Sequence, residues 1–306
     1  MRWRLTRLLL ILLLGFAGVV ALSWWQDPLY WSRWLDVMTH QSPDYMNFRP
    51  TASVGGDPIR EIPAAADDDA RTIAPAALRE AEQYAAEFDS YALIVVHHGV
   101  VQTEWYAPGW SPERLTQSQS MMKTLAALTV GLAIADGYIK SVDEPVSSYL
   151  PEWAGDPRGA IRIRDLLQMA SGLAQSRFTF NPFAEDSVFR VLVSSDRPAE
   201  YLRIRAAMAP GREFDYNDMD AALVGLIVQR ATGMPWQRWL DQKIWRPMGG
   251  APGKVWLDRD AADPPDPVTG SVSGDGPLAM TACCMLARCD GLGASGSDDE
   301  RQRSGG

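Results

Sequence analysis

The sequence predicts an α/β (α+β) protein in which an antiparallel strand pair lies beside a helical region. Two apolar segments, Tyr91 to Val96 and Val100 to Tyr106, are separated by a short turn, which predicts a β-hairpin. Two runs, from Ser120 to Gly137 and from Ala221 to Thr232, are strongly apolar, as helices buried in a core are. The segment from Ala76 to Phe88 carries its large apolar side chains on one side, which predicts a further helix.

Short signals at the ends of these segments indicate their boundaries. Pro75 stands just ahead of the first helix, and Gly137 and Gly233 follow the two apolar helices as C-terminal caps. The hairpin turn at 97–99 holds two histidines, which we interpret as turn residues rather than members of a catalytic triad, because the chain has no Gly-x-Ser-x-Gly elbow. A third apolar helix is expected from Trp236 to Trp245.

Composition limits the possible partners and cofactors. The chain has 306 residues and a net charge of -9, so nucleic acid is excluded as a partner because phosphate binding needs a basic face. The three cysteines, Cys283, Cys284 and Cys289, match no zinc-binding spacing. We expect them to be thiols in the core, and we expect neither a metal nor an organic cofactor.

The first 25 residues have the pattern of an export signal. Arg2, Arg4 and Arg7 precede an apolar stretch from Leu8 to Leu22, and no Ala-x-Ala cleavage site follows. Residues 1–25 are therefore predicted to be a signal anchor in a bacterial inner membrane, with the remainder in the periplasm. Removal of the segment after export and a buried N-terminal helix are the alternatives. Four nearby tryptophans suit a membrane interface: Trp24, Trp25, Trp31 and Trp34.

The remaining chain divides by composition. Residues 43–70 are rich in Pro, Gly, Ala and Asp, and we place an extended linker at 26–72. A folded domain is expected at 73–288. The last segment, 289–306, has too few apolar residues to bury a strand or a helix, so we expect it to be disordered.

Ser120 and Lys123 form the candidate catalytic pair. Residues three apart lie on the same face of a helix, so the hydroxyl and the amine can meet. A serine needs a nearby base to become a nucleophile, and burial lowers the pKa of a lysine so that it can be that base. A Ser-x-x-Lys spacing alone arises easily by chance.

Several motifs in order along the chain resemble the serine hydrolases of the penicillin-binding protein and class C β-lactamase superfamily. The similarity is greatest to the branch of esterases, D-amino-acid amidases and 6-aminohexanoate-dimer hydrolases, and it covers about residues 75 to 288. The matching stretches are the hairpin with His98-Gly99, Ser120-Met121-Met122-Lys123, Asp136-Gly137, Asp143-Glu144-Pro145-Val146, Tyr149-Leu150-Pro151, Leu166 to Leu173, Pro210 to Tyr216, Arg230 to Gly233 and Trp245 to Gly249.

The resemblance implies a β-lactamase-like three-layer fold and a role for Tyr216. In the family, the tyrosine of a Tyr-x-Asn motif works with the lysine as general base, and Tyr216 fits that position. Asp218 stands where asparagine is usual. A carboxylate donates no hydrogen bond, so Asp218 is either a substrate-binding residue of altered chemistry or only the N-cap of the following helix. The backbone N–H of Ser120 would form half of an oxyanion hole.

The family pattern stops after residue 288. The resemblance implies further central strands, a third motif and a C-terminal helix, which the sequence does not contain. A single-base frameshift near codon 289 is our hypothesis, because a reading one base later can restore a family-like helix beginning Ala-Thr-Asp-Trp-Ala-Arg-Leu-Gly. We expect the chain as written to fold poorly and to be weakly active or inactive, which the nucleotide sequence beyond codon 288 would test.

The resemblance implies a serine hydrolase that acts on small amides or esters through an acyl-enzyme on Ser120. One alternative is a non-catalytic remnant or peptidoglycan-binding module with the same fold. A second alternative is a D-alanyl-D-alanine carboxypeptidase or a β-lactamase. The sequence identifies neither the substrate nor the oligomeric state.

Overall fold

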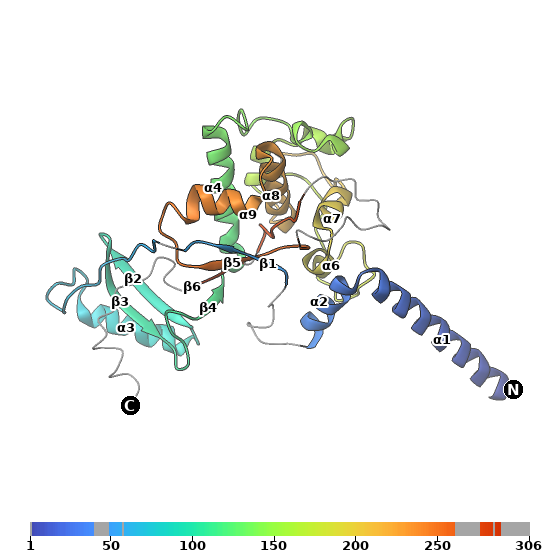
Figure 1. The fold of residues 1–306 in the computed structure, drawn as a ribbon, viewed down its shortest axis with the longest axis horizontal. Helices are drawn as coiled ribbons and strands as arrows, with labels where there is room; N and C mark the ends of the chain where they lie inside the picture. The colour runs from blue at the N-terminus through green and yellow to red at the C-terminus, as the bar shows by residue number, and fades with distance from the viewer. Residues whose placement is uncertain (1, 40–48, 57, 261–275, 284, 289–306) are drawn as a thin grey trace.

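The structure, a computed structural model, describes residues 2–39, 49–56, 58–260, 276–283 and 285–288. Its helices are α1 (Arg2–Gln26), α2 (Pro28–Thr39), α3 (Pro75–Glu87), α4 (Met122–Ala135), α5 (Ile163–Leu167), α6 (Val188–Val193), α7 (Arg197–Arg203), α8 (Asp218–Thr232) and α9 (Trp236–Leu240). Its strands are β1 (Thr51–Val54), β2 (Ala92–His97), β3 (Val100–Tyr106), β4 (Leu115–Gln117), β5 (Gly253–Trp256) and β6 (Met285–Arg288). Figure 1 shows the helices α4, α7, α8 and α9 on one side of the strands.

The described strands form two antiparallel sheets. One has the order β1-β5-β6-β4, and the other is the hairpin of β2 and β3. In the first sheet Thr51 lies opposite Trp256 and Val54 opposite Gly253. This combination of helices and antiparallel sheet confirms the predicted α/β (α+β) class.

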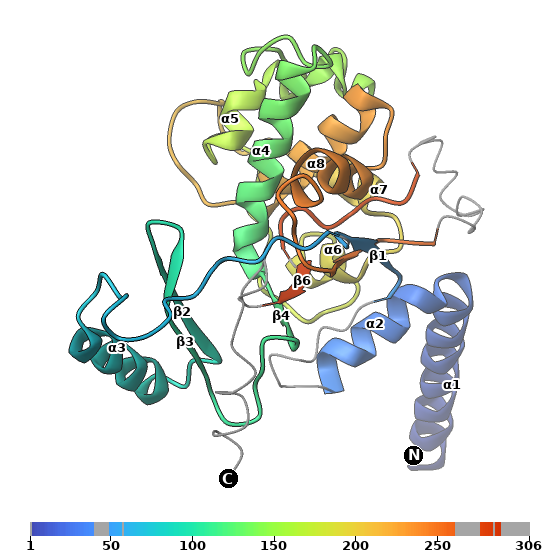
Figure 2. The same ribbon diagram turned by 60° about the vertical axis from the view of Figure 1, so that its left-hand side comes forward.

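The hairpin forms at the predicted place, with a bulge between Val95 and Val96. Its turn uses Gly99 at φ 78, a backbone conformation that glycine adopts without strain. Helix α3 lies beside the hairpin and away from α4 and α8 (Figure 2). Thr72 Oγ1 lies 2.6 Å from Nδ1 of His97.

Helix α8 passes through the centre of the helical region. Every side chain from residue 219 to residue 229 is buried, which is why its sequence is apolar on nearly all faces. Asn217 caps the helix by accepting a hydrogen bond from the Met219 N–H at 3.0 Å, and Gly233 ends it at φ 65. The predicted helix therefore exists and begins before Ala221.

Two tryptophans join α4 to α9 through one residue. The hydroxyl of Thr129, in α4, accepts a hydrogen bond from Trp236 Nε1 at 3.0 Å, and its carbonyl accepts one from Trp239 Nε1 at 3.3 Å. All three side chains are buried, and buried indole N–H groups need such acceptors. The expected third helix is shorter than predicted, because residues from Asp241 to Trp245 form a π-helical turn.

The segment 26–72 differs from the expected linker. It contains α2 and also β1, which is an edge strand of the larger sheet. Arg33 of α2 is buried and donates to the carbonyl oxygens of Ser194, Leu257 and Asp258 at 2.8 to 3.0 Å. Burial lowers the pKa of Arg33 to about 9. Composition alone missed these contacts because their partners are distant in sequence.

The N-terminal helix α1 extends away from the rest of the described chain (Figure 1). Among the residues that the structure describes, no helix is both long enough and apolar enough to span a bilayer. At the other end, Cys283 is disulfide-bonded, so the expectation of free core thiols is wrong for this residue. The tail 289–306 and its proposed frameshift lie outside the described residues.

Candidate active site

Ser120 lies in an exposed turn at the start of α4, a helix that buries one face and, contrary to the expectation of a fully buried helix, exposes Leu128 on the other. It is the central residue of a 3-10 turn, Gln119–Met121, that leads directly into α4. Backbone N–H groups in the first turn of a helix lack intrahelical acceptors, so the Ser120 N–H is suited to hold an anionic oxygen. Gln119, immediately before it, has φ 47. Such a left-handed backbone is uncommon for a residue with a side chain and is frequent at functional sites.

Three oxygen atoms surround the amine of Lys123. Its Nζ lies 3.1 Å from Ser120 Oγ, 2.5 Å from the carbonyl oxygen of Ala282 and 2.7 Å from Asp218 Oδ1. The side chain is 12% exposed. An ammonium group has three N–H donors, so the arrangement matches a charged lysine that uses all three. The spacing predicted the first contact and not the other two.

The Tyr216 phenol reaches the same serine from the loop that precedes α8. Its hydroxyl donates to Ser120 Oγ at 2.8 Å, and Lys123 Nζ lies 5.1 Å from the centre of its ring. Gln175 fixes the backbone here, because its Nε2 donates to the Tyr216 carbonyl and to Asp215 Oδ1, both at 2.6 Å. The structure thus brings together Ser120, Lys123 and Tyr216, the three catalytic residues that the sequence analysis predicted.

Asp218 is not the N-cap of α8. Asn217 occupies the cap, and Asp218 is the first residue of the helix, where the helix dipole favours a negative charge. Its side chain is 39% exposed and is paired with Lys123. The capping alternative is therefore wrong, and Asp218 belongs to the immediate surroundings of Ser120 and Lys123.

The sheet holds the serine turn in place through Ser118. The Ser118 N–H donates to the carbonyl of Met285 at 2.8 Å, and its Oγ accepts from the Met285 N–H at 3.0 Å. Ala282, whose carbonyl binds Lys123, lies three residues before Met285. No side-chain pattern could have predicted the role of Ala282, because the contact uses its backbone.

A buried acid lies beneath this segment. Asp220 is fully buried, and its Oδ1 accepts a hydrogen bond from Ser171 Oγ at 2.5 Å. Burial raises the pKa of Asp220 to about 7, although the bonds from Ser171 act in the opposite direction. Ser171 belongs to one of the matching stretches, Leu166 to Leu173, but no sequence signal pointed to Asp220, which lies just before the predicted helix.

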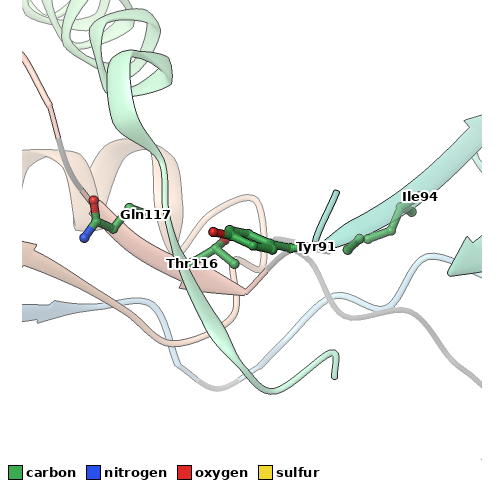
Figure 3. A pocket seen from close by; sticks show the side chains of 5 residues that line it. Tyr91, Ile94, Thr116 and Gln117 are labelled. Carbon is green, nitrogen blue, oxygen red and sulfur yellow. The ribbon is translucent and has the colours of Figure 1, made fainter. Parts of the chain in front are cut away.

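A cavity of about 380 Å³ opens between the hairpin and β4. It is lined by Tyr91, Ala92, Ile94, Thr116 and Gln117, and Figure 3 shows the Tyr91 ring beside Thr116. The three convergent residues do not line it. Within the described part of the chain, no group of three or more His, Cys, Asp or Glu side chains could hold a metal ion.

Comparison with known proteins identifies the family of the chain. The family model described as Beta-lactamase matches residues 78–279, more than half of the chain. The chain belongs to the beta-lactamase family. This match confirms the predicted superfamily. The relatives described next are hydrolases.

The individual relatives of this beta-lactamase family member are distant. The 6-aminohexanoate-dimer hydrolase of Paenarthrobacter ureafaciens is 26% identical over 213 residues, covering 67% of this chain and 52% of the relative. The N-acetylmuramyl-L-alanine amidase of Bacillus subtilis is 28% identical over 187 residues, covering 54% of this chain and 42% of the relative. The chain thus spans about half the length of these curated relatives or less.

Solved structures support the same fold. A class C beta lactamase from Rhodobacter sphaeroides superposes with a TM-score of 0.50 and 21% identity, covering 71% of this chain and 63% of that one. A Bacillus anthracis structure, provisionally described as a 6-aminohexanoate-dimer hydrolase, gives a TM-score of 0.59 and 16% identity, with 87% and 68% covered. At these identities the likeness establishes the fold of the beta-lactamase family and leaves substrates open.

Proposed function

We propose that the protein is a serine hydrolase that cleaves small amides or esters through an acyl-enzyme on Ser120. The observation that carries this proposal is the meeting of three side chains from two segments of the chain that are distant in sequence. The Ser120 Oγ accepts hydrogen bonds from Tyr216 at 2.8 Å and from Lys123 at 3.1 Å. An exposed serine with two titratable partners within hydrogen-bonding reach has the arrangement of an activated nucleophile.

The contacts of Lys123 suggest different roles for the two residues that bond to Ser120. Because the amine already donates to Ala282 and Asp218, we assign Lys123 the role of a cation that stabilises negative charge on the neighbouring oxygens. Tyr216, as phenolate, would take the proton of Ser120 while Oγ attacks the substrate carbonyl. This differs from the expectation that a neutral lysine is the base.

The reaction would then proceed in two balanced steps. The bond from Ser120 Oγ to the carbonyl carbon forms, the bond to the leaving nitrogen or oxygen breaks, and Tyr216 returns the proton to the leaving group. Water next attacks the acyl-enzyme and gives its proton through the same phenol to Ser120, which releases a carboxylic acid. The Ser120 N–H would hold the carbonyl oxygen during both steps.

The names of the relatives support amides as substrates. They include a 6-aminohexanoate-dimer hydrolase and an N-acetylmuramyl-L-alanine amidase, and we favour small amides or esters over β-lactams. A non-catalytic remnant or cell-wall-binding module remains the alternative from another class, and a D-alanyl-D-alanine carboxypeptidase or β-lactamase remains the alternative within the family.

Covalent labelling tests the proposal. A neutral fluorophosphonate probe should label the full chain at Ser120, and Ser120→Ala should abolish the label. Ser148→Ala, which removes an exposed serine outside the site, should retain it. Tyr216→Phe should slow labelling by about a hundredfold, because it removes the general base. Absence of label in the folded wild type would favour the non-catalytic alternative.

We further infer that the N-terminal segment holds the chain at a bacterial inner membrane with the hydrolase domain in the periplasm. The sequence pattern of residues 1–25 supports this inference, as do the apolar side chains that α1 exposes: Leu10, Ile11, Leu14, Val19 and Leu22. An alkaline phosphatase fusion after residue 26 tests the inference, since the enzyme is active only when exported. An inactive fusion would contradict it.

A further inference from the structure

Asp218 places a negative charge at the edge of the candidate active site. Its Oδ1 lies 2.7 Å from Lys123 Nζ, and that nitrogen is 3.1 Å from Ser120 Oγ. The Asp218 side chain is 39% exposed, against 12% for Lys123. A substrate that approaches Ser120 from solvent therefore meets the carboxylate more readily than the ammonium group.

Beside the serine, Asp218 and Lys123 form an ion pair with no net charge. The Asp218 carboxylate cancels the charge of Lys123. The segment that carries Tyr216 also contains Glu213, an exposed acid that is not paired with Lys123. An asparagine at 218 would leave the lysine charge uncancelled beside the serine. A carboxylate also accepts hydrogen bonds from an ammonium or amide N–H and donates none.

We propose that Asp218 determines the charge specificity of this hydrolase by excluding substrates with a carboxylate near the scissile bond and accepting uncharged and cationic ones. The proposal rests on the proposed function of Ser120. It adds that the substrates are amides or esters whose leaving group is neutral or positively charged. Like charges brought together at a binding site disfavour binding, whereas opposite charges favour it.

Three thioesters of one acyl group test the proposal with the full chain. N-Benzoylglycyl thioesters of thioglycolate, methyl thioglycolate and thiocholine have anionic, neutral and cationic leaving groups of similar size. Release of the thiol is followed with a chromogenic disulfide reagent. The wild type should prefer the thiocholine ester to the thioglycolate ester. In Asp218→Asn the ratio of the two kcat/KM values should move by about tenfold or more toward the anion, because the change in charge acts on both substrates in opposite directions.

The control and the alternative role of Asp218 are distinguishable. Glu213→Gln removes an exposed negative charge of the same segment that does not pair with Lys123, and its ratio should stay within about twofold of the wild type because solvent screens such charges. If Asp218 only holds Lys123 in position, Asp218→Asn will slow all three thioesters equally, and this outcome overturns the proposal.

Failure of the charge proposal and failure of the proposed function give different results. If Ser120→Ala still releases thiol at the wild-type rate, the function assigned to Ser120 is wrong. If Ser120→Ala is inactive and Asp218→Asn leaves the ratio unchanged, only the charge proposal is wrong. Labelling by the neutral fluorophosphonate shows that a variant is folded, and Asp218→Ser replaces Asp218→Asn if the latter takes no label. If neither variant is labelled, Asp218 is structural and the proposal is overturned.

Discussion

The buried carboxyl of Asp220 should make the stability of the protein depend on pH in a direction opposite to that of a salt-bridged acid. The side chain is fully buried, and its pKa is raised from 3.8 to about 7, chiefly by burial. Its Oδ2 has no hydrogen-bond partner among the described residues. The folded protein therefore retains a proton that the unfolded chain releases at lower pH.

The magnitude follows from the two pKa values. At about 1.4 kcal/mol for each pH unit, the difference between 3.8 and about 7 corresponds to about 4 kcal/mol of stability. This contribution is fully present below pH 3.8 and is lost as the pH rises through about 7. About 3 kcal/mol of it should disappear between roughly pH 4.5 and pH 7.5.

Asp220→Asn isolates this contribution, because asparagine has nearly the same shape and does not titrate. Urea unfolding of both proteins, followed by circular dichroism across that pH range, gives the difference between their free energies of unfolding. The free energy of unfolding of the wild type minus that of the variant should fall by about 3 kcal/mol as the pH rises. A difference that stays constant within about 1 kcal/mol would refute the reasoning, since one pKa unit corresponds to that amount. The control is Asp186→Asn, which changes an exposed acid whose pKa Arg177 lowers. This variant should still lose stability with rising pH as the wild type does.

Two further substitutions test the packing. Gly225→Ala places a methyl group against the buried side chain of Thr281, and it should lower the free energy of unfolding by about 1–2 kcal/mol. Its control is Gly131→Ala in α4, where the space is open. This substitution should raise the free energy of unfolding by up to about 1 kcal/mol. Arg33→Leu leaves buried carbonyl groups without their donor, and it should lower the free energy of unfolding by about 2–3 kcal/mol. Its control, Arg203→Leu, changes a side chain that is 56% exposed and should alter the free energy of unfolding by no more than about 0.5 kcal/mol. Urea midpoints measure all four, and equal effects within either pair would contradict the packing described.

The elements that the sequence predicted correctly are those with strong local signals. The hairpin has two apolar runs around a turn with Gly99, and α8 has an apolar run from residue 221 to residue 228 and ends at Gly233. Ser120 and Lys123 were found because helical spacing is a local property. Tyr216 required the family resemblance, since nothing local relates it to a serine 96 positions earlier.

The features that escaped prediction depend on contacts between distant segments. Strand β1 is only four residues long, and it is stable as a strand because β5 pairs with it. The carbonyl of Ala282 reaches Lys123 through tertiary structure alone. The role of Asp218 could not be read from sequence either, because an acid at the start of a helix is common and its partner Lys123 lies on another helix.

The participation of β1 and α2 in the fold has a practical consequence for work with the purified protein. The composition invites a truncation just before α3, and that cut would remove an edge strand of the larger sheet together with the buried guanidinium of Arg33. A shortened version intended for crystals or assays should instead start close to residue 27, so that it discards α1 and retains every segment that the sheet holds.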